Sequence, residues 1–360
     1  MARLTRELRC LFEFWLLPLT VALLPYRAGV ALARGCARAL PLYDAAARAG
    51  LAQYAAARPY GDTYAWLAEF RFTQLIDHAD LFWAWTRSER FLLDRIDARP
   101  PTGLNPLVVV SMHYGQGLWL LRWLRAGGLP ARFLSVRFDP STFESRLHYL
   151  YARLRMRTVL RMAGAPPIYT GGAREEIALT LGRGGVVYGL IDVPVAPGTT
   201  TAANALLFGQ PVYWPPGLVD CARAADADLM LLCARCLKDG RRHVDAVRLA
   251  DADVGGIATT FGGAIEAAPG AWHFWHLLPA FAVHGGNATG ADAASPAATA
   301  PVRADVASPA TAAPAGADAG SAVTASATAD AAPRAPSVPA GSAQAPVAGV
   351  RAGIGEGAAQ

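Results

Sequence analysis

The chain has 360 residues and a net charge of +5, with 33 Lys or Arg residues against 28 Asp or Glu residues. Lys238 is its only lysine, and this mild arginine excess fits an acidic partner or an anionic membrane face equally well, while it is weak evidence for nucleic acid binding. Five irregularly spaced cysteines exclude a disulfide framework and favour a reducing compartment. Cys233 and Cys236 form a CxxC pair inside an apolar run, so we expect buried small residues there and no metal site.

The first 27 residues have the pattern of an uncleaved membrane anchor. Arginines at positions 3, 6 and 9 precede the run CLFEFWLLPLTVALLPY, which is as long as the shortest spanning helices, about 17 residues. Glu13 and Pro18 interrupt this run. We therefore expect a helix that spans the membrane or lies in its interface, the alternative being a buried helix of the globular domain.

Residues 28–104 are predicted to form a helical lead-in. Bulky side chains between Leu67 and Trp85 recur near a period of 3.6 residues, which is typical of helices packed into a core. Pro100, Pro101 and Gly103 end this portion.

An α/β domain is predicted over residues 105–284. The apolar run Leu107–Val110 indicates a buried strand, and the residues after a Gly-containing turn, from Leu118 onward, indicate a helix. Ligands of open α/β sheets bind beyond the carboxyl ends of the strands, where His113 stands. His113 is therefore the first candidate for a catalytic residue.

The next elements are a strand in ARFLSVRFDP and a long helix over residues 143–162. Ser141 and Glu144 have the spacing of a capping box at the start of that helix. Arg146, Arg153 and Arg157 share one helix face, which suits an anionic membrane, a phosphate-bearing substrate or an acidic carrier protein; a solvated charged face is the alternative.

Alternating elements continue to residue 284. We expect a helix over Ala173–Leu181, a strand in GGVVYGLIDVP that ends at Asp192, a strand–helix–strand unit over 206–237, a strand in RRHVDAVRL and a closing helix with an aromatic-rich end. This order predicts an α/β fold with a mostly parallel central sheet flanked by helices. Residues 285–360 are almost wholly small or polar and lack aromatic residues, which predicts a disordered tail.

Four motifs occur in an order that resembles one known family. They are HYGQGLW from His113, IDVP around Asp192, LLFGQPV around Gly209, and APGAWHFWH from Ala268 to His276. Together they resemble the bacterial lipid A biosynthesis acyltransferases, the late lauroyl and myristoyl transferases of the lysophospholipid acyltransferase superfamily. The resemblance covers roughly residues 10 to 280.

The resemblance implies a protein at the bacterial inner membrane whose catalytic domain faces the cytoplasm. Such enzymes need no metal or other cofactor and move a fatty acyl chain from acyl carrier protein or coenzyme A to a hydroxyl of a membrane lipid. Their signature is a histidine followed, after four residues, by Asp or Glu, because the carboxylate orients the imidazole that removes the proton of the acceptor. Here His113 matches the histidine, but Leu118 occupies the acid position.

Three interpretations follow from Leu118. Asp192 supplies the acid, with Glu144 and Asp139 as poorer candidates; or His113 works without a carboxylate; or the protein has lost catalysis and keeps only lipid or carrier binding. The predicted substrate-binding residues are Tyr114, Gly115, Gln116, Arg137, Arg146 and Arg153.

For the remaining histidines we expect structural roles: packing or interfacial anchoring for His273 and His276, and a place in the helical core for His78.

We thus expect a membrane-associated acyltransferase that acts on a hydroxyl or amine of a lipid or glycolipid. Its partners are acyl carrier protein and the lipid acceptor, not nucleic acid. The rival is a non-catalytic lipid- or carrier-binding protein of the same fold.

Overall fold

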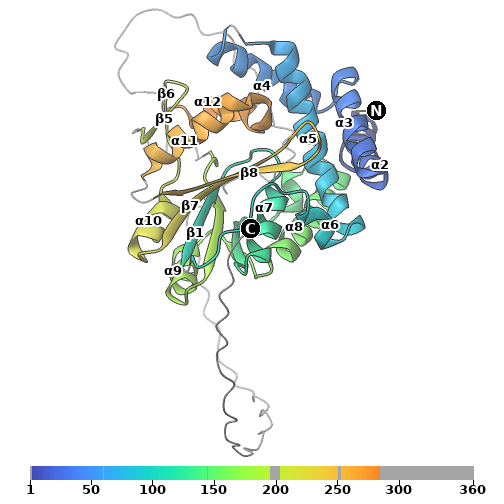
Figure 1. Cartoon of the computed structure of the whole chain (residues 1–360). Coiled ribbons are helices and arrows are strands. Elements are labelled where there is room, and N and C mark those ends of the chain that lie inside the picture. Colours follow the sequence, from blue (N-terminus) through green and yellow to red (C-terminus); the bar gives the residue numbers. More distant parts are fainter. Residues whose placement is uncertain are drawn as a thin grey trace, which may run out of the picture. The chain divides into compact units, whose positions relative to one another are not determined.

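A central sheet dominates the computed structural model, which describes residues 2–59, 61–104, 106–143, 145–194, 203–249 and 253–283 (Figure 1). In these residues six strands have the spatial order β3-β2-β4-β1-β7-β8. All neighbours run parallel except β7 and β8. The predicted α/β class with a mostly parallel sheet is confirmed. The strands are β1 Leu107–Ser111, β2 Ala131–Ser135, β3 Ile168–Tyr169, β4 Val186–Leu190, β7 Asp228–Cys236 and β8 Arg242–Leu249.

Helices cover both faces of this sheet. On one face lie α7 (Gly117–Ala126) and α8 (Arg146–Ala163), which share a core with Val109 and Tyr188. On the other face lie α9 (Ala173–Gly182), α10 (Gly217–Ala224) and α11 (Val254–Ala267), which share a core with Val108 and Val187. Figure 1 shows α7 and α8 to the right of the strands, and α9 and α10 to the left.

The path of the chain creates a crevice between β1 and β4. After β1 the chain passes through α7 on one face, and after β4 it continues to α10 on the other, although the two strands are parallel neighbours. In doubly wound sheets, ligands bind where neighbouring strands send their connections to opposite faces. The sheet therefore places a binding crevice just beyond Ser111 and Leu190, which are paired in register.

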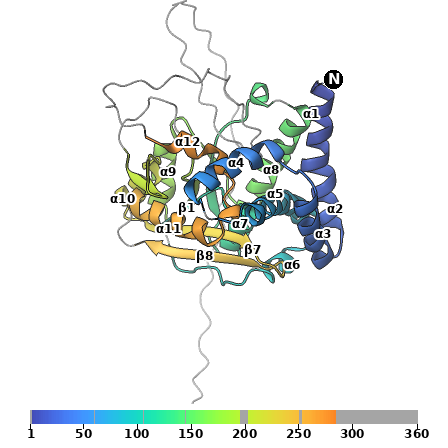
Figure 2. The same cartoon turned by 90° about the horizontal axis from the view of Figure 1, so that it is seen from above.

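The predicted helical lead-in is confirmed over most of its length. It consists of α3 (Tyr26–Ala39), α4 (Asp44–Ala57), α5 (Thr63–Thr86) and α6 (Glu89–Leu93). The Asp62 side chain caps α5 by accepting from the amide of Ala65, and most of this helix is buried from Phe70 to Ala84. The long helix α5 is in contact with α2 (Leu17–Leu23), α3 and α4 (Figure 2).

The first residues form a helical segment made of α1 (Ala2–Cys10), a π-helical turn η1 (Leu11–Leu16) and α2 (Leu17–Leu23). Among the described residues no helix has both the length and the apolar character needed to cross a bilayer, so the structure does not support a spanning anchor. One face packs against α5 and α3 through Phe14, Leu17 and Val21. Glu13, which interrupts the apolar run, is buried and accepts a bond from the Tyr43 amide.

Two local expectations were wrong, and one short strand was missed. The strand expected near residues 206–212 is instead a hairpin, β5 (Ala205–Leu207) and β6 (Gln210–Val212), outside the main sheet. Phe208 and Gly209 have positive φ, as hairpin turns with the twist of the strands require. The cap of α8 is Ser145, not Ser141, which lies in the 3-10 turn η2 (Pro140–Thr142). The two-residue strand β3 was not expected at all.

Short turns follow α11: η3 (Pro269–Ala271), η4 (Trp275–Leu277) and α12 (Leu278–Phe281). They carry the predicted aromatic-rich end, whose Trp272, Phe274 and Trp275 are buried. The tail expected to be disordered, 285–360, and Glu144 lie outside the described residues.

Candidate active site

His113 and Asp192 form a hydrogen-bonded pair across the crevice between β1 and β4. Each lies two residues beyond the end of its strand, and His113 Nδ1 is 2.9 Å from Asp192 Oδ1. The same carboxylate accepts the His113 backbone N–H at 2.9 and 3.0 Å and the Trp272 indole N–H at 3.0 Å. Because a carboxylate accepts, Nδ1 is the nitrogen that carries the ring proton, which leaves Nε2 as the unprotonated nitrogen of the neutral ring.

The two side chains differ in their exposure to solvent. The Asp192 side chain is fully buried, whereas the His113 side chain is 10% exposed and lines a cavity. Asp192, the first candidate among the possible acids, is therefore in contact with His113. Asp139 instead accepts from the Ser141 amide in the turn η2.

The turn that carries His113 is fixed by its backbone. Gly115 has a φ of +56°, and a Cβ atom there would lie 1.8 Å from the carbonyl oxygen of Ala234, so a side chain at this position would collide with β7. The Gly115 amide donates to Ala271 and the Gln116 amide to Ala234. These bonds explain why the strand is followed by a glycine turn here: the chain passes directly against β7.

The aromatic-rich segment that follows α11 packs over the pair. The Phe274 ring stacks on the His113 ring with centroids 4.0 Å apart. The His273 amide donates to the His113 carbonyl oxygen, and the His273 ring donates from Nε2 to the Gly115 carbonyl oxygen over 2.9 Å. Burial lowers the pKa of His273, which favours the neutral ring. We expected packing or interfacial anchoring for His273, and it packs directly against the site.

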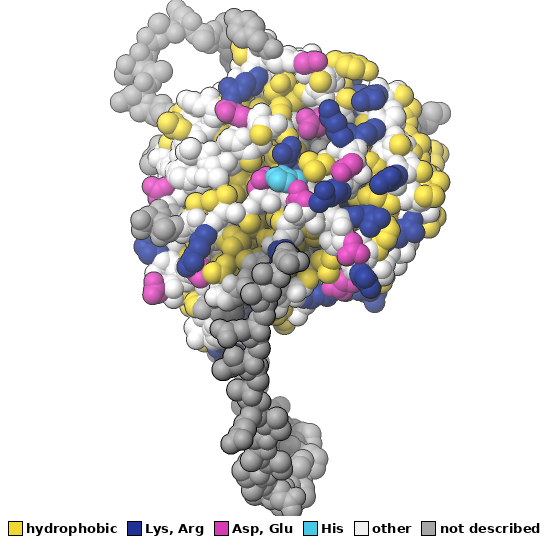
Figure 3. Space-filling model, in the orientation of Figure 1, with side chains coloured by type: hydrophobic (Ala, Val, Ile, Leu, Met, Phe, Trp, Pro, Cys, Tyr) yellow, Lys and Arg dark blue, Asp and Glu magenta, His cyan; other side chains and the backbone are white. Residues whose placement is uncertain are grey.

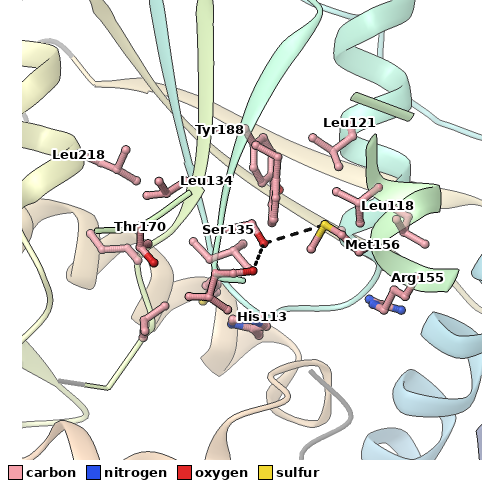
Figure 4. A pocket seen from close by; sticks show the side chains of 18 of the residues that line it. His113, Leu118, Leu121, Leu134, Ser135, Arg155, Met156, Thr170, Tyr188 and Leu218 are labelled. Atoms are coloured by element: carbon pink, nitrogen blue, oxygen red, sulfur yellow. Dashed lines mark hydrogen bonds between the residues drawn. The ribbon is translucent and has the colours of Figure 1, made fainter. Parts of the chain in front are cut away.

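A cavity of about 400 Å³ opens beside His113, within the usual range for small-molecule sites (Figure 4). Most of its lining is apolar. Its apolar side chains include Leu118, Leu121, Phe133, Leu134, Met156, Val159, Ile177, Leu190, Ile191 and Leu218. Leu118, which stands where the resembling family has its acid, is buried in this wall.

One ion pair lies in the cavity wall. Arg155 on α8 bonds Asp77 on α5, with Nη2 2.8 Å from one carboxylate oxygen and 3.0 Å from the other. Burial by itself would raise the pKa of Asp77, but the charge of Arg155 outweighs it and holds this pKa below its usual range. Figure 4 shows Arg155 on the same side of the pocket as Leu118 and Met156.

The structure brings some of the predicted substrate-binding residues to the site and not others. Tyr114 and Gly115 line the cavity, and Gln116 is buried behind the turn. Arg137, Arg146 and Arg153 are exposed and are not part of the cavity lining; Arg137 lies over the ring of Tyr169 instead.

Sequence reasoning missed Arg155 and Asp77. The available signal was helical spacing: Arg155 follows Tyr151 by four residues, so it belongs to the apolar face of α8 and not to its basic face. A single arginine on a buried face needs a partner, which α5 supplies with Asp77. The described residues contain no cluster of three or more His, Cys, Asp or Glu side chains suited to a metal.

No protein-family model matches the chain, and no curated protein shows a match to it. The family resemblance drawn from the motifs therefore remains a prediction.

Proposed function

We propose that the protein transfers a fatty acyl group from a thioester to a hydroxyl or amine of a lipid acceptor. The observation that carries the proposal is the His113–Asp192 pair at the mouth of an apolar cavity. A base held by a buried carboxylate suits deprotonation of a nucleophile, and an apolar cavity beside it suits a hydrocarbon chain.

The reaction follows from the position of the ring. Nε2 of His113 takes the proton of the acceptor hydroxyl while the oxygen attacks the thioester carbonyl carbon. The tetrahedral oxyanion then collapses, the carbon–sulfur bond breaks, and the imidazolium returns the proton to the leaving thiolate. Asp192 keeps the ring oriented and stabilises its positive charge. Arg155 is a cationic group of the cavity wall and the candidate partner for the oxyanion or for a phosphate of the donor.

Acyl carrier protein is the donor partner that we propose, with coenzyme A as the alternative. The exposed arginines of α8, Arg146, Arg153 and Arg157, lie on the helix whose other side forms the cavity wall. An acidic carrier protein that binds there would lie on the element that carries Arg155.

We also propose that the protein associates with an anionic membrane surface through its first helical segment, without spanning the membrane. Outside the face packed on α5, this segment carries a stripe of exposed apolar side chains, of which four are spaced four residues apart and the fifth follows seven residues later. The stripe consists of Leu4 (66% exposed), Leu8 (56%), Phe12 (43%), Leu16 (50%) and Leu23 (62%). Exposed arginines at 3, 6, 9 and 27 flank it, as in helices that lie in a membrane interface. Figure 3 shows hydrophobic and basic side chains side by side along the right-hand edge, where α2 and α3 lie in Figure 1.

The test is transfer of a radiolabelled acyl chain from acyl carrier protein or coenzyme A to membrane lipid extract. His113→Ala is expected to lower the rate by about 10²–10⁴-fold, the usual share of general-base catalysis. His243→Ala, which changes a partly exposed histidine on β8, is the matched control. If His113→Ala is as active as the parent, His113 is not the base.

The rival is a protein that binds lipid or carrier protein without catalysis. The same assay decides between the two. A parent protein that retains carrier protein or lipid but transfers no label would favour the rival.

A further inference from the structure

Three arginines share one carboxylate near the C-terminal ends of α7 and α8. Both carboxylate oxygens of Glu89 lie 2.6 Å from Arg125 Nη2, and one of them lies 3.9 Å from Arg122 Nη1. The charge of Arg161 also acts on Glu89, and the Arg161 carbonyl oxygen accepts from Arg125 Nη1 at 2.7 Å. The hydrogen bond from Arg125 holds the pKa of Glu89 below its usual range, so this carboxylate stays charged. We call Arg122, Arg125 and Arg161 the arginine cluster; its three positive charges face one negative charge.

Arg122 is the member of the cluster whose charge is least compensated. It is buried, and Glu89 is its carboxylate partner within the described residues, at the long distance of 3.9 Å. Its Nη2 atom is 2.8 Å from the sulfur atom of Met162, which is a weak acceptor. A buried cation needs a counter-charge, but Arg125 already takes both oxygens of Glu89. An anion bound at the surface of the cluster supplies the missing charge.

Trp85 places an exposed aromatic side chain beside the cluster. It is 42% exposed, and its indole N–H donates to the hydroxyl of Thr158 on α8 at 2.9 Å. The guanidinium of Arg161 lies over its ring, 4.7 Å from the centroid, and forms no ion pair within the described part of the chain. Exposed tryptophans are enriched where proteins meet the membrane–water interface, and arginines are attracted to anionic lipids there.

The cluster adjoins the apolar stripe of the first helical segment. Arg87, two residues after Trp85, donates to the carbonyl oxygens of Ala22 and Leu24 at the end of α2. Leu23, the last member of the stripe, lies between these two residues. Figure 3 shows several basic side chains close together on the right-hand part of this face, where α6 and α8 lie in Figure 1. The stripe, Trp85 and the arginines thus follow one another along the surface.

We propose that the arginine cluster and Trp85 bind the phosphate of an anionic phospholipid, at a site separate from the cavity of His113. The phosphodiester accepts from Arg125 and Arg161 and offsets the charge of Arg122, while Trp85 packs against the glycerol. None of these four residues lines the cavity. A lipid phosphate suits the cluster better than free phosphate or nucleic acid, because an exposed apolar stripe leads up to it. The inference names the lipid class for the membrane association proposed above and does not depend on acyl transfer.

Co-sedimentation of the full chain with vesicles at matched ionic strength tests the site. Arg161→Gln is expected to weaken binding to mixed phosphatidylcholine–phosphatidylglycerol vesicles about fivefold, since an arginine near an anionic membrane contributes about 1 kcal/mol. It leaves binding to pure phosphatidylcholine vesicles unchanged. Glu89→Gln removes the competing carboxylate and is expected to strengthen binding to the anionic vesicles about fivefold.

Arg90→Gln is the matched control. Arg90 is an exposed arginine of the same helix as Glu89, and its Nε lies 3.9 Å from its own partner Asp94. Its replacement is expected to change the binding less than about twofold, because exposed charges outside a built site are screened by salt. If Arg90→Gln weakens binding as much as Arg161→Gln, or if Arg161→Gln binds like the parent, the proposal is overturned.

Thermal unfolding with a soluble lipid provides a readout that does not depend on vesicles. Dihexanoyl phosphatidylglycerol, below its micelle concentration, is expected to raise the melting temperature of the parent and of Arg90→Gln but not that of Arg161→Gln. An equal rise with inorganic phosphate would assign the site to free phosphate, and tighter binding of a single-stranded RNA oligonucleotide would assign it to nucleic acid; either result overturns the lipid site.

The stripe and the cluster can be told apart by the same vesicles. Leu8→Glu with Phe12→Glu is expected to weaken binding to neutral and anionic vesicles alike, whereas Arg161→Gln acts on the anionic ones alone. Acyl transfer measured in detergent solution is expected to be unchanged in Arg161→Gln, because the cluster is not part of the cavity. A parent that transfers no acyl group but shows the vesicle effects keeps the lipid site and overturns only the proposed reaction.

Discussion

At the scale of single residues, the site depends on the carboxylate that holds His113. Asp192 is fully buried and accepts bonds from the ring and the backbone of His113 and from Trp272. All its partners belong to the turn after β1 or to the closing aromatic segment. Its role in the structure is therefore to join these two segments as well as to orient the ring.

Asp192→Asn is expected to keep these segments together but to lower the transfer rate by about 10²–10⁴-fold, because an amide cannot stabilise the imidazolium. Acyl transfer, followed alongside thermal unfolding, measures this. A variant with unchanged melting temperature and low activity agrees with the assignment. Unchanged activity would remove Asp192 from the reaction.

The pair of Arg155 and Asp77 is the second residue-scale feature with a measurable consequence. Asp77→Asn leaves a mostly buried guanidinium without its counter-charge, and removal of one partner of such a pair costs about 3–5 kcal/mol. The double variant Asp77→Asn with Arg155→Gln is expected to regain most of that loss. Urea unfolding of the two variants tests it; a double variant less stable than the single one would show that the charges are not coupled.

Residue types were enough to select His113 and Asp192 but not Arg155. His113 and Asp192 can each be selected from the neighbouring sequence, because each follows an apolar run that predicts a buried strand. The role of Arg155 depends on which side of α8 faces the sheet. Its arginine neighbours Arg153 and Arg157 have the same chemistry but face solvent.

At the scale of elements, hydrophobic patterning predicted most helices and strands. β1 and β4 are buried apolar runs, and α5 is a long helix with bulky side chains all round. The errors occur where a long-range partner decides the outcome. α8 begins at Arg146, after its cap Ser145, where Glu7 of α1 accepts from the Ser145 hydroxyl and from two amides of the first turn. β3 has two residues, too few for a periodic signal.

The exposed stripe on the first helical segment yields the element-scale prediction. Leu8→Glu together with Phe12→Glu is expected to weaken binding to mixed phosphatidylcholine–phosphatidylglycerol vesicles at least tenfold, since burying each side chain contributes about 1.5–3 kcal/mol. Leu206→Glu, at an exposed position of the hairpin, is the matched control. Vesicle co-sedimentation measures the binding. If the parent and the stripe variant bind the vesicles equally well, the first helical segment is not the membrane-binding surface.

At the scale of the whole molecule, the order of strands decides which side chains meet. β4 lies between β1 and β2, although three helices and two strands separate it from β1 along the chain. The alternation of predicted strands and helices along the sequence indicates a parallel sheet, but it does not predict the spatial order of the strands in that sheet. The meeting of His113 and Asp192 follows from it directly, because only neighbouring parallel strands end side by side.

Buried histidines make the stability of the whole fold depend on pH. Burial lowers the pKa of His78 from 6.5 to about 3. The unfolded chain takes up a proton at this residue near pH 6.5, whereas the folded chain does not until much lower pH, so stability is lost as the pH falls below 6.5. The loss is about 1.4 kcal/mol per pH unit.

His78→Gln is therefore expected to flatten the fall of the melting temperature between pH 6.5 and pH 5, by about 4–8 °C over this interval. Thermal unfolding of parent and variant at matched ionic strength measures the difference in slope. A constant offset, without any change in slope, would show that His78 has the same pKa in the folded and the unfolded chain. The hydrogen bond of His78 to Tyr151 contributes such an offset in either case.

The contact of Glu7 with α8 has a practical consequence for handling the protein. The Glu7 carboxylate joins α1 to α8, because it accepts hydrogen bonds from two amides of α8. The same helix α8 carries Arg155, which lies in the cavity wall. Removal of residues 1–10 to improve yield would thus loosen the start of α8, a helix that forms part of the cavity wall. Recombinant versions that keep residues 1–10 intact, with any affinity tag at the opposite terminus, are the ones in which ligand binding should be measured.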